Sequence, residues 1–312
     1  MKKFDPHNRY IELPVREENT LMGFLMKQMS GTSRNHVKDL LKGRAITVDR
    51  KITTRFDAVL KPGQLVQVRR HKQNIELNNK FVRLIYEDKD LVVIEKQSGI
   101  LSQGLSPAQY CVKTVLDEYF HRRQFKCTAH VVHRLDRETS GLMIYAKSTE
   151  IQQILEEDWR QIVYDRRYVA LVSGRMERDG GVIRSWLHEG PGFKTLSSPT
   201  DDGGRESVTY FHTLQAVDDY SLVEFRLETG RKNQIRVHMQ QLGHPVAGDQ
   251  KYGDGRNPLG RLALHAFRLH FYHPRTGQPM EFDTPIPLLF QQRFMKHQIH
   301  EEASEIPGSD QL

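Results

Sequence analysis

The chain has 312 residues, of which 38% are hydrophobic and 27% are charged, enough for about two domains with a proper core. No apolar run approaches the roughly 20 residues that span a bilayer, and residues 1–5 are not followed by the apolar stretch of a signal peptide. Two cysteines, Cys111 and Cys127, indicate neither a disulfide framework nor a zinc cluster. We therefore expect a reduced, cytoplasmic setting without a membrane.

The positive charge is concentrated in the N-terminal quarter of the chain. The formal net charge is +7, yet residues 1–72 alone carry 16 Lys and Arg against 7 Asp and Glu. Such asymmetry is typical of a polyanion-binding module joined to a second domain. The alternative is a solvated basic face that has no partner.

Two short helices are predicted near the N-terminus. Apolar residues at helical spacing mark them: Leu21, Phe24, Leu25 and Met29, then Val37, Leu40 and Leu41. Ser33 is a suitable N-cap for the second helix, and Gly43 is a suitable stop. Four basic residues accompany the second helix: Arg34, Lys38, Lys42 and Arg44. The first three are spaced four apart, so they share one helix face.

Strands predicted at 46–48 and 65–70 complete a small α+β module. Residues 18–70 resemble the S-four-type RNA-binding domain, which is named after a small-subunit ribosomal protein. The resemblance implies that the four basic residues contact RNA phosphates and read little sequence. A polar, weakly patterned stretch at 71–80 marks the boundary. We expect domains at 1–72 and 80–295, and a frayed tail at 296–312.

The second domain opens with a predicted hairpin, strands 81–86 and 91–94, with Lys96 near its exit. Farther along, residues 131–147 place two apolar arms on either side of a charged centre with Arg134 and Asp136. The chain enters the core, makes a charged loop and returns. A rigid scaffold that presents charged loop residues is typical of an active site, whereas a surface ion pair at a hairpin tip is the alternative.

Further elements follow in chain order. We expect a helix capped by Ser148 or Thr149, a strand at 166–174, long loops at 175–210 that could include a hairpin, and a strand at 223–227. The stripe of the first helix is Ile151, Ile154, Leu155 and Trp159. A last helix begins near residue 233 and ends before Gly243. Arg236 lies in its first turns, where the helix dipole disfavours a cation unless a carboxylate faces it. Asp136 is the natural candidate.

Three segments resemble the motifs of the RluA-type pseudouridine synthases. The first is His-Arg-Leu-Asp at 133–136 with Thr-Ser-Gly-Leu at 139–142, the second is the strand with Tyr168, and the third is 229–238. Two departures occur: the opening Lys-Pro-x-Gly reads Lys-Gln-Ser-Gly at 96–99, and the third motif has Lys232-Asn233 where Thr-His is more common. A kinase catalytic loop also begins with His-Arg, but its Asn spacing, Gly-rich loop and Asp-Phe-Gly are missing from this sequence.

The resemblance implies an α+β fold with a mixed, mainly antiparallel sheet and flanking helices, and isomerisation of uridine in RNA. It implies Asp136 as the catalytic carboxylate, Arg236 as its ion-pair partner, Tyr168 as the base-stacking residue and Arg134 as an RNA contact. Lys96 either supports the site or is an exposed strand-end lysine. Whether Asp136 attacks the sugar, attacks the base or removes a sugar proton stays open.

We expect no cofactor, a monomer, and large-subunit ribosomal RNA as the partner. The five histidines between 238 and 273 lack the His-x-x-x-His spacing with an adjacent glutamate, so no metal site is predicted. Three alternatives remain: a transfer RNA pseudouridine synthase, an inactive RNA-binding or assembly protein, and a metal-dependent RNA hydrolase.

Overall fold

A computed structural model describes residues 10–29, 33–42, 44–69, 77–106, 108–292 and 294. The chain divides into two compact units, Met1–Glu76 and Leu77–Leu312, and the predicted linker at 71–80 spans this division. The predicted helix stop at Gly43 and the predicted tail at 296–312 lie outside the described residues. No helix in the described part of the chain is long and apolar enough to cross a membrane.

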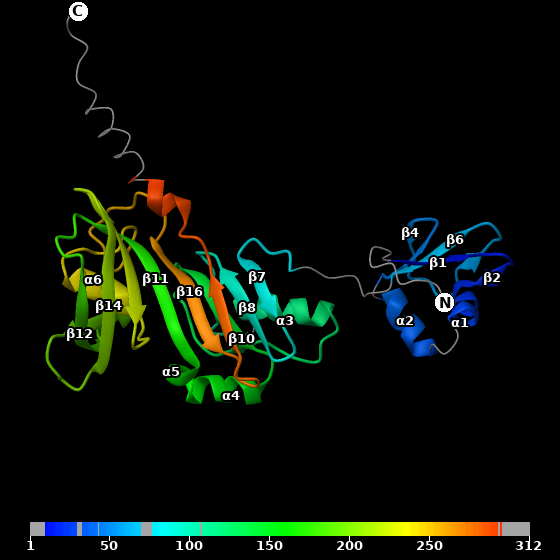
Figure 1. Ribbon diagram of the computed structural model, residues 1–312, viewed down its shortest axis with the longest axis horizontal. Helices are drawn as coiled ribbons and strands as arrows, with labels where there is room; N and C mark the ends of the chain where they lie inside the picture. The colour runs from blue at the N-terminus through cyan, green and yellow to red at the C-terminus, as the bar shows by residue number, and fades with distance from the viewer. Residues whose placement is uncertain are drawn as a thin grey trace, which may run out of the picture. The chain divides into compact units, whose positions relative to one another are not determined.

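The N-terminal unit packs two helices, α1 (Leu21–Gln28) and α2 (Arg34–Lys42), against short strands (Figure 1). A four-stranded sheet has the order β1-β6-β3-β4, and a separate pair joins β2 to β5. The strands are β1 (Tyr10–Pro14), β2 (Asn19–Thr20), β3 (Ile46–Val48), β4 (Lys51–Ile52), β5 (Val59–Leu60) and β6 (Leu65–Arg69). The apolar stripes predicted for both helices meet in one core, which confirms the two helices.

The C-terminal unit is built on one sheet of eleven strands. These are β7 (Val82–Glu87), β8 (Leu91–Lys96), β9 (His130–Val131), β10 (Ser140–Ala146), β11 (Val163–Ser173), β12 (Gly180–Glu189), β13 (Thr195–Ser198), β14 (Arg205–Ala216), β15 (Tyr220–Leu227), β16 (Leu264–Tyr272) and β17 (Pro279–Asp283). The main path is β13-β12-β14-β15-β11-β16-β10-β8-β7. Only β10 and β16 pair in parallel among the described strands, so the predicted mixed, mainly antiparallel α+β fold is confirmed.

Helices cover both faces of this sheet (Figure 1). They are α3 (Val112–Arg122), α4 (Thr149–Glu157), α5 (Trp159–Ile162) and α6 (Gln234–Gln241), with a 3-10 turn at Pro191–Phe193. Because side chains alternate along a strand, Met143 and Tyr145 of β10 pack in the core with α3 and α6. Leu142 and Ile144 point the other way and pack with Ile151 of α4. The predicted cap of α4 is present, since Ser148 Oγ accepts a hydrogen bond from the backbone of this helix.

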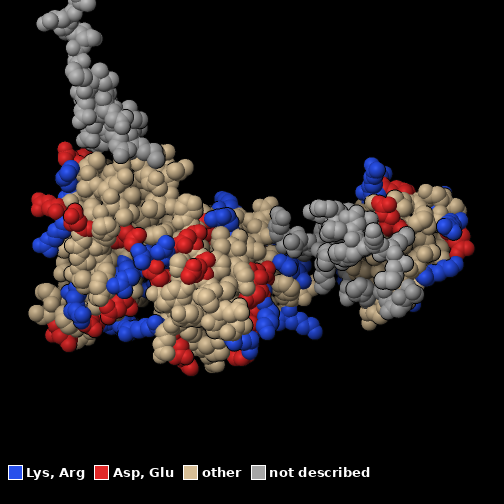
Figure 2. Space-filling model, viewed as in Figure 1, with Lys and Arg blue, Asp and Glu red and all other residues tan. Residues whose placement is uncertain are grey.

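The prediction of long loops at 175–210 was wrong, because β12, β13 and the first half of β14 occupy that stretch. The hairpin that the sequence left open is present, since β12 pairs antiparallel with both β13 and β14. The inward positions of these strands are partly polar: Ser185, Ser207 and Thr209 are fully buried. Buried hydroxyl groups that are hydrogen-bonded can occupy a core, but they remove the hydrophobic alternation by which a strand is identified in a sequence. Lys and Arg are interspersed with Asp and Glu over the visible face of this unit (Figure 2).

A close approach of two strands positions the start of β10. Gly141 has φ +126° and pairs with Ala266 of β16. A Cβ atom at Gly141 would lie 2.2 Å from the Ala266 carbonyl oxygen, so a side chain cannot fit there. This contact fixes the strand that leads directly out of the predicted charged loop.

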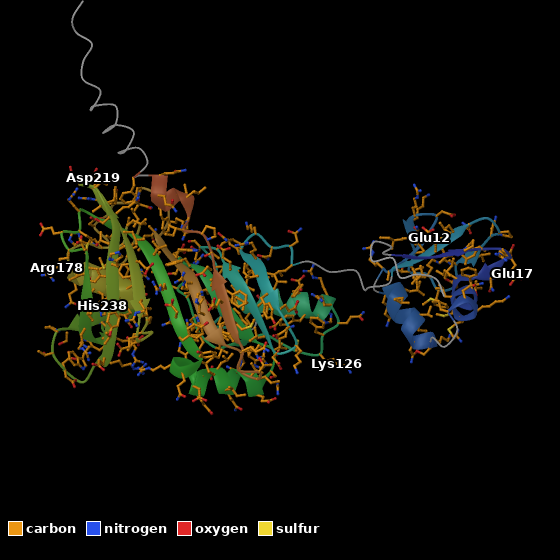
Figure 3. The ribbon with its side chains drawn as sticks, in the orientation of Figure 1. Glu12, Glu17, Lys126, Arg178, Asp219 and His238 are labelled. Carbon is orange, nitrogen blue, oxygen red and sulfur yellow. The ribbon has the colours of Figure 1, made fainter. Side chains whose placement is uncertain are left out.

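A buried polar network fixes α6 against the sheet. His238 of α6 lies against β12 and β14 (Figure 3). Its Nε2 is 2.9 Å from Ser185 Oγ of β12, and its Nδ1 is 2.8 Å from Thr209 Oγ1 of β14. Gln234, also buried, donates to the Val208 carbonyl and to Thr209. Burial lowers the pKa of His238 to about 4, so the imidazole is neutral at neutral pH.

This histidine makes stability depend on pH. The unfolded chain binds a proton at His238 near pH 6.5 and the folded chain only near pH 4, so acid favours unfolding. We expect the free energy of unfolding to fall by about 1.4 kcal/mol per pH unit across that window for this group. Urea unfolding of wild type and His238→Gln at pH 7, 6 and 5 checks this. The slope should be smaller by about one proton in the variant, and identical slopes would contradict the prediction.

Candidate functional site

The loop between β9 and β10 is fixed by buried neutral groups. Ser102 Oγ donates to the Leu135 carbonyl at 2.8 Å, directly before Asp136. The Ile144 N–H donates to His133 Nε2 at 3.0 Å, which ties the entry of the loop to β10. Burial lowers the pKa of His133 to about 3, so this ring is a neutral acceptor. Asp136 is therefore carried on a braced loop.

Lys96 is a second brace for the same loop. Its side chain is fully buried, and its Nζ donates to three carbonyl oxygens, those of Gln97 at 3.0 Å, Ile100 at 2.8 Å and Arg137 at 2.9 Å. Burial lowers the pKa of Lys96 to about 7, although Glu138 opposes the change. The alternative of an exposed strand-end lysine was wrong, because Lys96 joins the end of β8 to the residue after Asp136.

The structure brings Asp136 and Arg236 together. Arg236 Nη1 donates to Asp136 Oδ2 at 3.0 Å, across 100 residues of sequence. The Arg236 side chain is 14% exposed and that of Asp136 is 31% exposed. The ion pair thus joins the first turns of α6 to the charged loop, at a place that solvent partly reaches.

A second carboxylate, Asp249, is the closer partner of Arg236. Nε and Nη2 of Arg236 donate to the two oxygens of Asp249 at 2.6 and 2.8 Å, and the Asp249 side chain is fully buried. Burial by itself would raise the pKa of Asp249, but the bonds from Arg236 outweigh it, so this pKa is lowered. The same bonds hold the pKa of Arg236 well above its usual range, against the effect of burial. Sequence reasoning missed this residue.

Asn233 completes the setting of Arg236. It precedes α6 in a left-handed conformation, with φ 57° and ψ 17°. Its Oδ1 accepts from Arg236 Nη1 at 2.8 Å, and its Nδ2 donates to Tyr252 Oη at 3.2 Å. The Tyr252 ring lies 5.1 Å from the guanidinium. The residue that departs from the family motif therefore helps to orient the arginine.

This arrangement leaves Asp136 with two different oxygens. Oδ2 is fixed by Arg236, whereas Oδ1 has no hydrogen-bond donor among the residues that the structure describes. Asp249 takes two hydrogen bonds from Arg236, whereas Asp136 takes only one. An oriented, partly exposed carboxylate of this kind can act as a base, as a nucleophile or as a stabiliser of positive charge.

Tyr168 and Arg134 differ in exposure. Tyr168 lies in β11 opposite Ala266, which in turn pairs with Gly141, so the tyrosine is two strands from the start of β10. The residue is 6% exposed, and the Arg166 guanidinium lies 5.9 Å from its ring. Arg134 is exposed on the charged loop. Tyr168, the predicted base-stacking residue, is thus mostly buried, whereas Arg134, the predicted RNA contact, is accessible.

The predicted basic face of the N-terminal unit is also accessible. Arg34, Lys38 and Lys42 of α2 and the following Arg44 are exposed, while Val37 on the opposite side is buried. None of the four forms an ion pair with a carboxylate in the described part of the chain. Their charge is therefore available to a polyanion.

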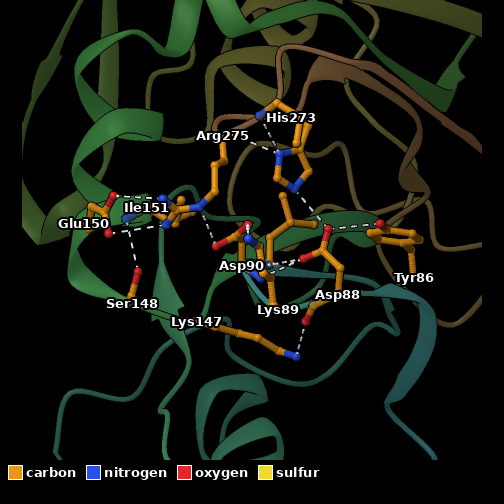
Figure 4. A network of polar contacts seen from close by, with 12 residues as sticks. Tyr86, Asp88, Lys89, Asp90, Lys147, Ser148, Glu150, Ile151, His273 and Arg275 are labelled. Atoms are coloured by element: carbon orange, nitrogen blue, oxygen red, sulfur yellow. Dashed lines mark hydrogen bonds and ion pairs between the residues drawn. The ribbon is translucent and has the colours of Figure 1, made fainter.

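A group of possible metal ligands lies away from these residues. Oxygen or nitrogen atoms of Asp88, Asp90 and His273 lie within 4.8 Å of one another. His273 Nδ1 accepts the backbone N–H of Arg275 at 3.2 Å, so Nε2 carries the proton that it donates to Asp88 (Figure 4). Arg275 pairs with Asp90 at 2.9 Å. Hydrogen bonds and an arginine already use this group, which favours a structural network over a metal site.

Comparisons with known proteins agree on one family. A family model described as RNA pseudouridylate synthase matches residues 90–241. The chain is 39% identical over 206 residues to the uncharacterized RNA pseudouridine synthase YjbO of Bacillus subtilis. The aligned region covers 65% of this chain and 72% of that protein. The chain is also 32% identical over 281 residues to ribosomal large subunit pseudouridine synthase D of Neisseria meningitidis, covering 84% of this chain and 74% of that protein.

A solved structure shows the same similarity. Human RNA pseudouridylate synthase domain containing 4 superposes with a TM-score of 0.54 and 26% identity, over 70% of this chain and 91% of that chain.

The Arg236–Asp249 pair makes a prediction about stability. Asp249→Asn leaves a mostly buried guanidinium without its main counter-charge, so we expect the free energy of unfolding to fall by about 3 to 5 kcal/mol. The matched control is Asp283→Asn, which removes a half-exposed carboxylate paired with Arg268 and should lose less than about 1 kcal/mol. Urea unfolding measures both, and equal losses would show that Asp249 has no special role.

Proposed function

This chain belongs to the RluA-type family of RNA pseudouridine synthases, and we propose that it isomerises uridine in large-subunit ribosomal RNA with Asp136 as the catalytic carboxylate. The observation that carries the proposal is the 3.0 Å contact between Asp136 and Arg236. The relative from Neisseria meningitidis is named for the large ribosomal subunit, and its similarity extends over 84% of this chain. That extent supports ribosomal RNA over transfer RNA as the substrate.

The chemistry sets clear demands on the site. The base is cut from its sugar, turned, and rejoined through a ring carbon, so a carboxylate must stand close to the anomeric carbon. Asp136 meets this demand because Arg236 orients Oδ2 while Oδ1 stays unbonded among the described residues. We propose that no cofactor takes part, since an isomerisation leaves the oxidation state unchanged. The geometry is compatible with attack on the sugar, attack on the base, or removal of a sugar proton.

Other residues hold the substrate in this proposal. The target base must leave the helical stack and be held against an aromatic or apolar surface, and Tyr168 supplies such a wall from β11. Arg134, exposed beside Asp136, contacts the RNA or helps to open the stack. A site with little water keeps the detached base from being lost. Lys96 and Asp249 are positioning residues, because they act through the loop and through Arg236.

The N-terminal unit is proposed to bind RNA as an S-four-type domain. Its second helix buries Val37 and presents Arg34, Lys38 and Lys42 on the exposed side. Cations on one helix face match the phosphates of structured RNA and depend little on base sequence.

The catalytic proposal is tested by Asp136→Asn with tritium release from carbon five of uridine. The substrate is tritiated RNA from cells that lack the gene, so every target uridine is unmodified. We expect release to fall by about 1,000-fold or more, because the amide has no charge to stabilise or trap the sugar cation. The control Glu138→Gln removes a half-exposed carboxylate of the same loop and should stay within about twofold. Release by Asp136→Asn at the wild-type rate would end the proposal. No release by wild type would favour the inactive RNA-binding protein.

The role of the N-terminal unit is tested by neutralising its basic face. The triple change of Arg34, Lys38 and Lys42 to Gln should weaken RNA binding and flatten the plot of log affinity against log salt by about 2. The matched control changes three exposed cations outside α2, Arg50, Lys51 and Lys61, to Gln. Filter binding between 50 and 300 mM salt measures the slopes. Equal slopes for the two triple variants would remove the RNA role from α2.

A further inference from the structure

Arg261 is a partly buried arginine that the proposed chemistry does not use. Its Nη2 donates to Ser140 Oγ at 2.7 Å and to the Leu264 carbonyl at 3.4 Å, and its Nε donates to the Leu262 carbonyl at 3.0 Å. The guanidinium lies 5.8 Å from the Phe290 ring. These contacts lock the plane of the guanidinium and set its direction.

All of these acceptors are neutral. Ser140 Oγ accepts from Arg261 and donates its own hydrogen bond to His265 Nδ1 at 2.8 Å. The other two acceptors are carbonyl groups. No carboxylate of the described residues forms an ion pair with Arg261, in contrast to Arg236, which has two such partners. Burial lowers the pKa of Arg261, although Glu138 opposes the change. A guanidinium that is partly removed from water without an ion-pair partner among the described residues is unfavourable, which points to an anion that comes from outside this part of the chain.

One edge of this guanidinium remains free. Nη1 has no hydrogen-bond partner among the described residues. The buried side-chain atoms without a partner in that part of the chain are Asp90 Oδ2, His133 Nδ1 and Ser173 Oγ. Nη1 is not one of them, so it is accessible to solvent. The two N–H groups on Nη1 are the correct donors for an anionic oxygen that arrives from outside.

The position of Arg261 ties it to Asp136 by two routes. Ser140, its acceptor, follows Asp136 by four residues, and a turn closes between them because the Thr139 N–H donates to the Asp136 carbonyl. The Cα atoms of Asp136 and Ser140 are therefore at most about 14 Å apart. On the other side, the Arg261 carbonyl packs against Gly248, where a Cβ atom would lie only 2.1 Å away. Gly248 precedes Asp249, the partner of Arg236.

We propose that Arg261 is a phosphate-binding residue, whose Nη1 edge holds a backbone phosphodiester of the RNA beside the target uridine. This inference rests on the proposed function for its substrate. A phosphodiester is the anion that every nucleotide of that substrate carries, and an arginine recognises it by its planar fork. The anchored guanidinium holds the RNA backbone next to the target nucleotide. Arg261 thus acts on binding, and Asp136 acts on the reaction.

A structural brace is the competing explanation, and kinetics separate the two. Arg261→Gln keeps a donor for Ser140 but removes the charge. With the tritiated RNA, we expect KM to rise about tenfold while kcat stays within about twofold, and log affinity against log salt to flatten by about 0.7 to 0.9. The control Arg184→Gln removes one charge from an exposed ion pair with Glu206 on β12 and β14 and should change neither quantity.

Arg261→Lys keeps the charge without the fork, so it should retain the salt slope while KM rises several-fold. An unchanged KM and slope in a folded Arg261→Gln would overturn the proposal. If that variant does not fold, Arg261→Lys decides, and an unchanged KM there overturns it equally. The salt slopes are also measured in the Asp136→Asn background. The phosphate contact is therefore tested even if wild type converts no uridine, an outcome that would count against the proposed function alone.

Discussion

The shared guanidinium of Arg236 is the contact on which the C-terminal unit's candidate site depends. It joins the start of α6, the loop that carries Asp249 and the loop that carries Asp136. The sharing is unequal, because the fully buried Asp249 receives two bonds and the partly exposed Asp136 receives one. A guanidinium neutralised by one carboxylate orients the second without neutralising it fully. Asp136 is thereby placed, and one of its oxygens has no hydrogen-bond donor among the described residues.

Two further basic side chains near this loop, Lys96 and Arg261, are held by neutral groups. Lys96 donates to three carbonyl oxygens, and Arg261 donates to a hydroxyl and two carbonyls. Neither forms an ion pair with a carboxylate among the described residues, although the Glu138 carboxylate acts on both groups. Hydrogen bonds to neutral acceptors therefore set the positions of both side chains. The same loop is braced by His133, a histidine that burial keeps neutral, so the support adds no further charge.

The parts of this structure that the sequence predicted are those whose signal is local. Alternating or continuous apolar residues marked β7, β8 and β10, and helical spacing marked α1, α2 and α4. The pairing of Arg236 with a carboxylate followed from the helix dipole alone. Asp249 lies in a segment, 243–249, that extends the resemblance, but the sequence assigned it no role, because its partner is thirteen residues away and no periodicity connects a buried loop carboxylate to a helix. Lys96 stayed undecided for a related reason: a lysine at a strand end is normally exposed, and only the fold shows that its Nζ donates to three carbonyl oxygens.

Asn233 shows how a departure from a motif can preserve the geometry that the motif serves. The position needs a left-handed backbone before α6, which asparagine tolerates better than most residues. It also needs an acceptor for Arg236 and a donor for Tyr252, and an amide provides both on one short side chain. The neighbouring Lys232 contributes its charge elsewhere, to Glu189 at the end of β12. Of the two residues that depart from the motif, Asn233 orients Arg236 and Lys232 pairs with the exposed Glu189. The requirement at this point of the fold is on hydrogen-bond direction and backbone conformation, and Asn233 meets both.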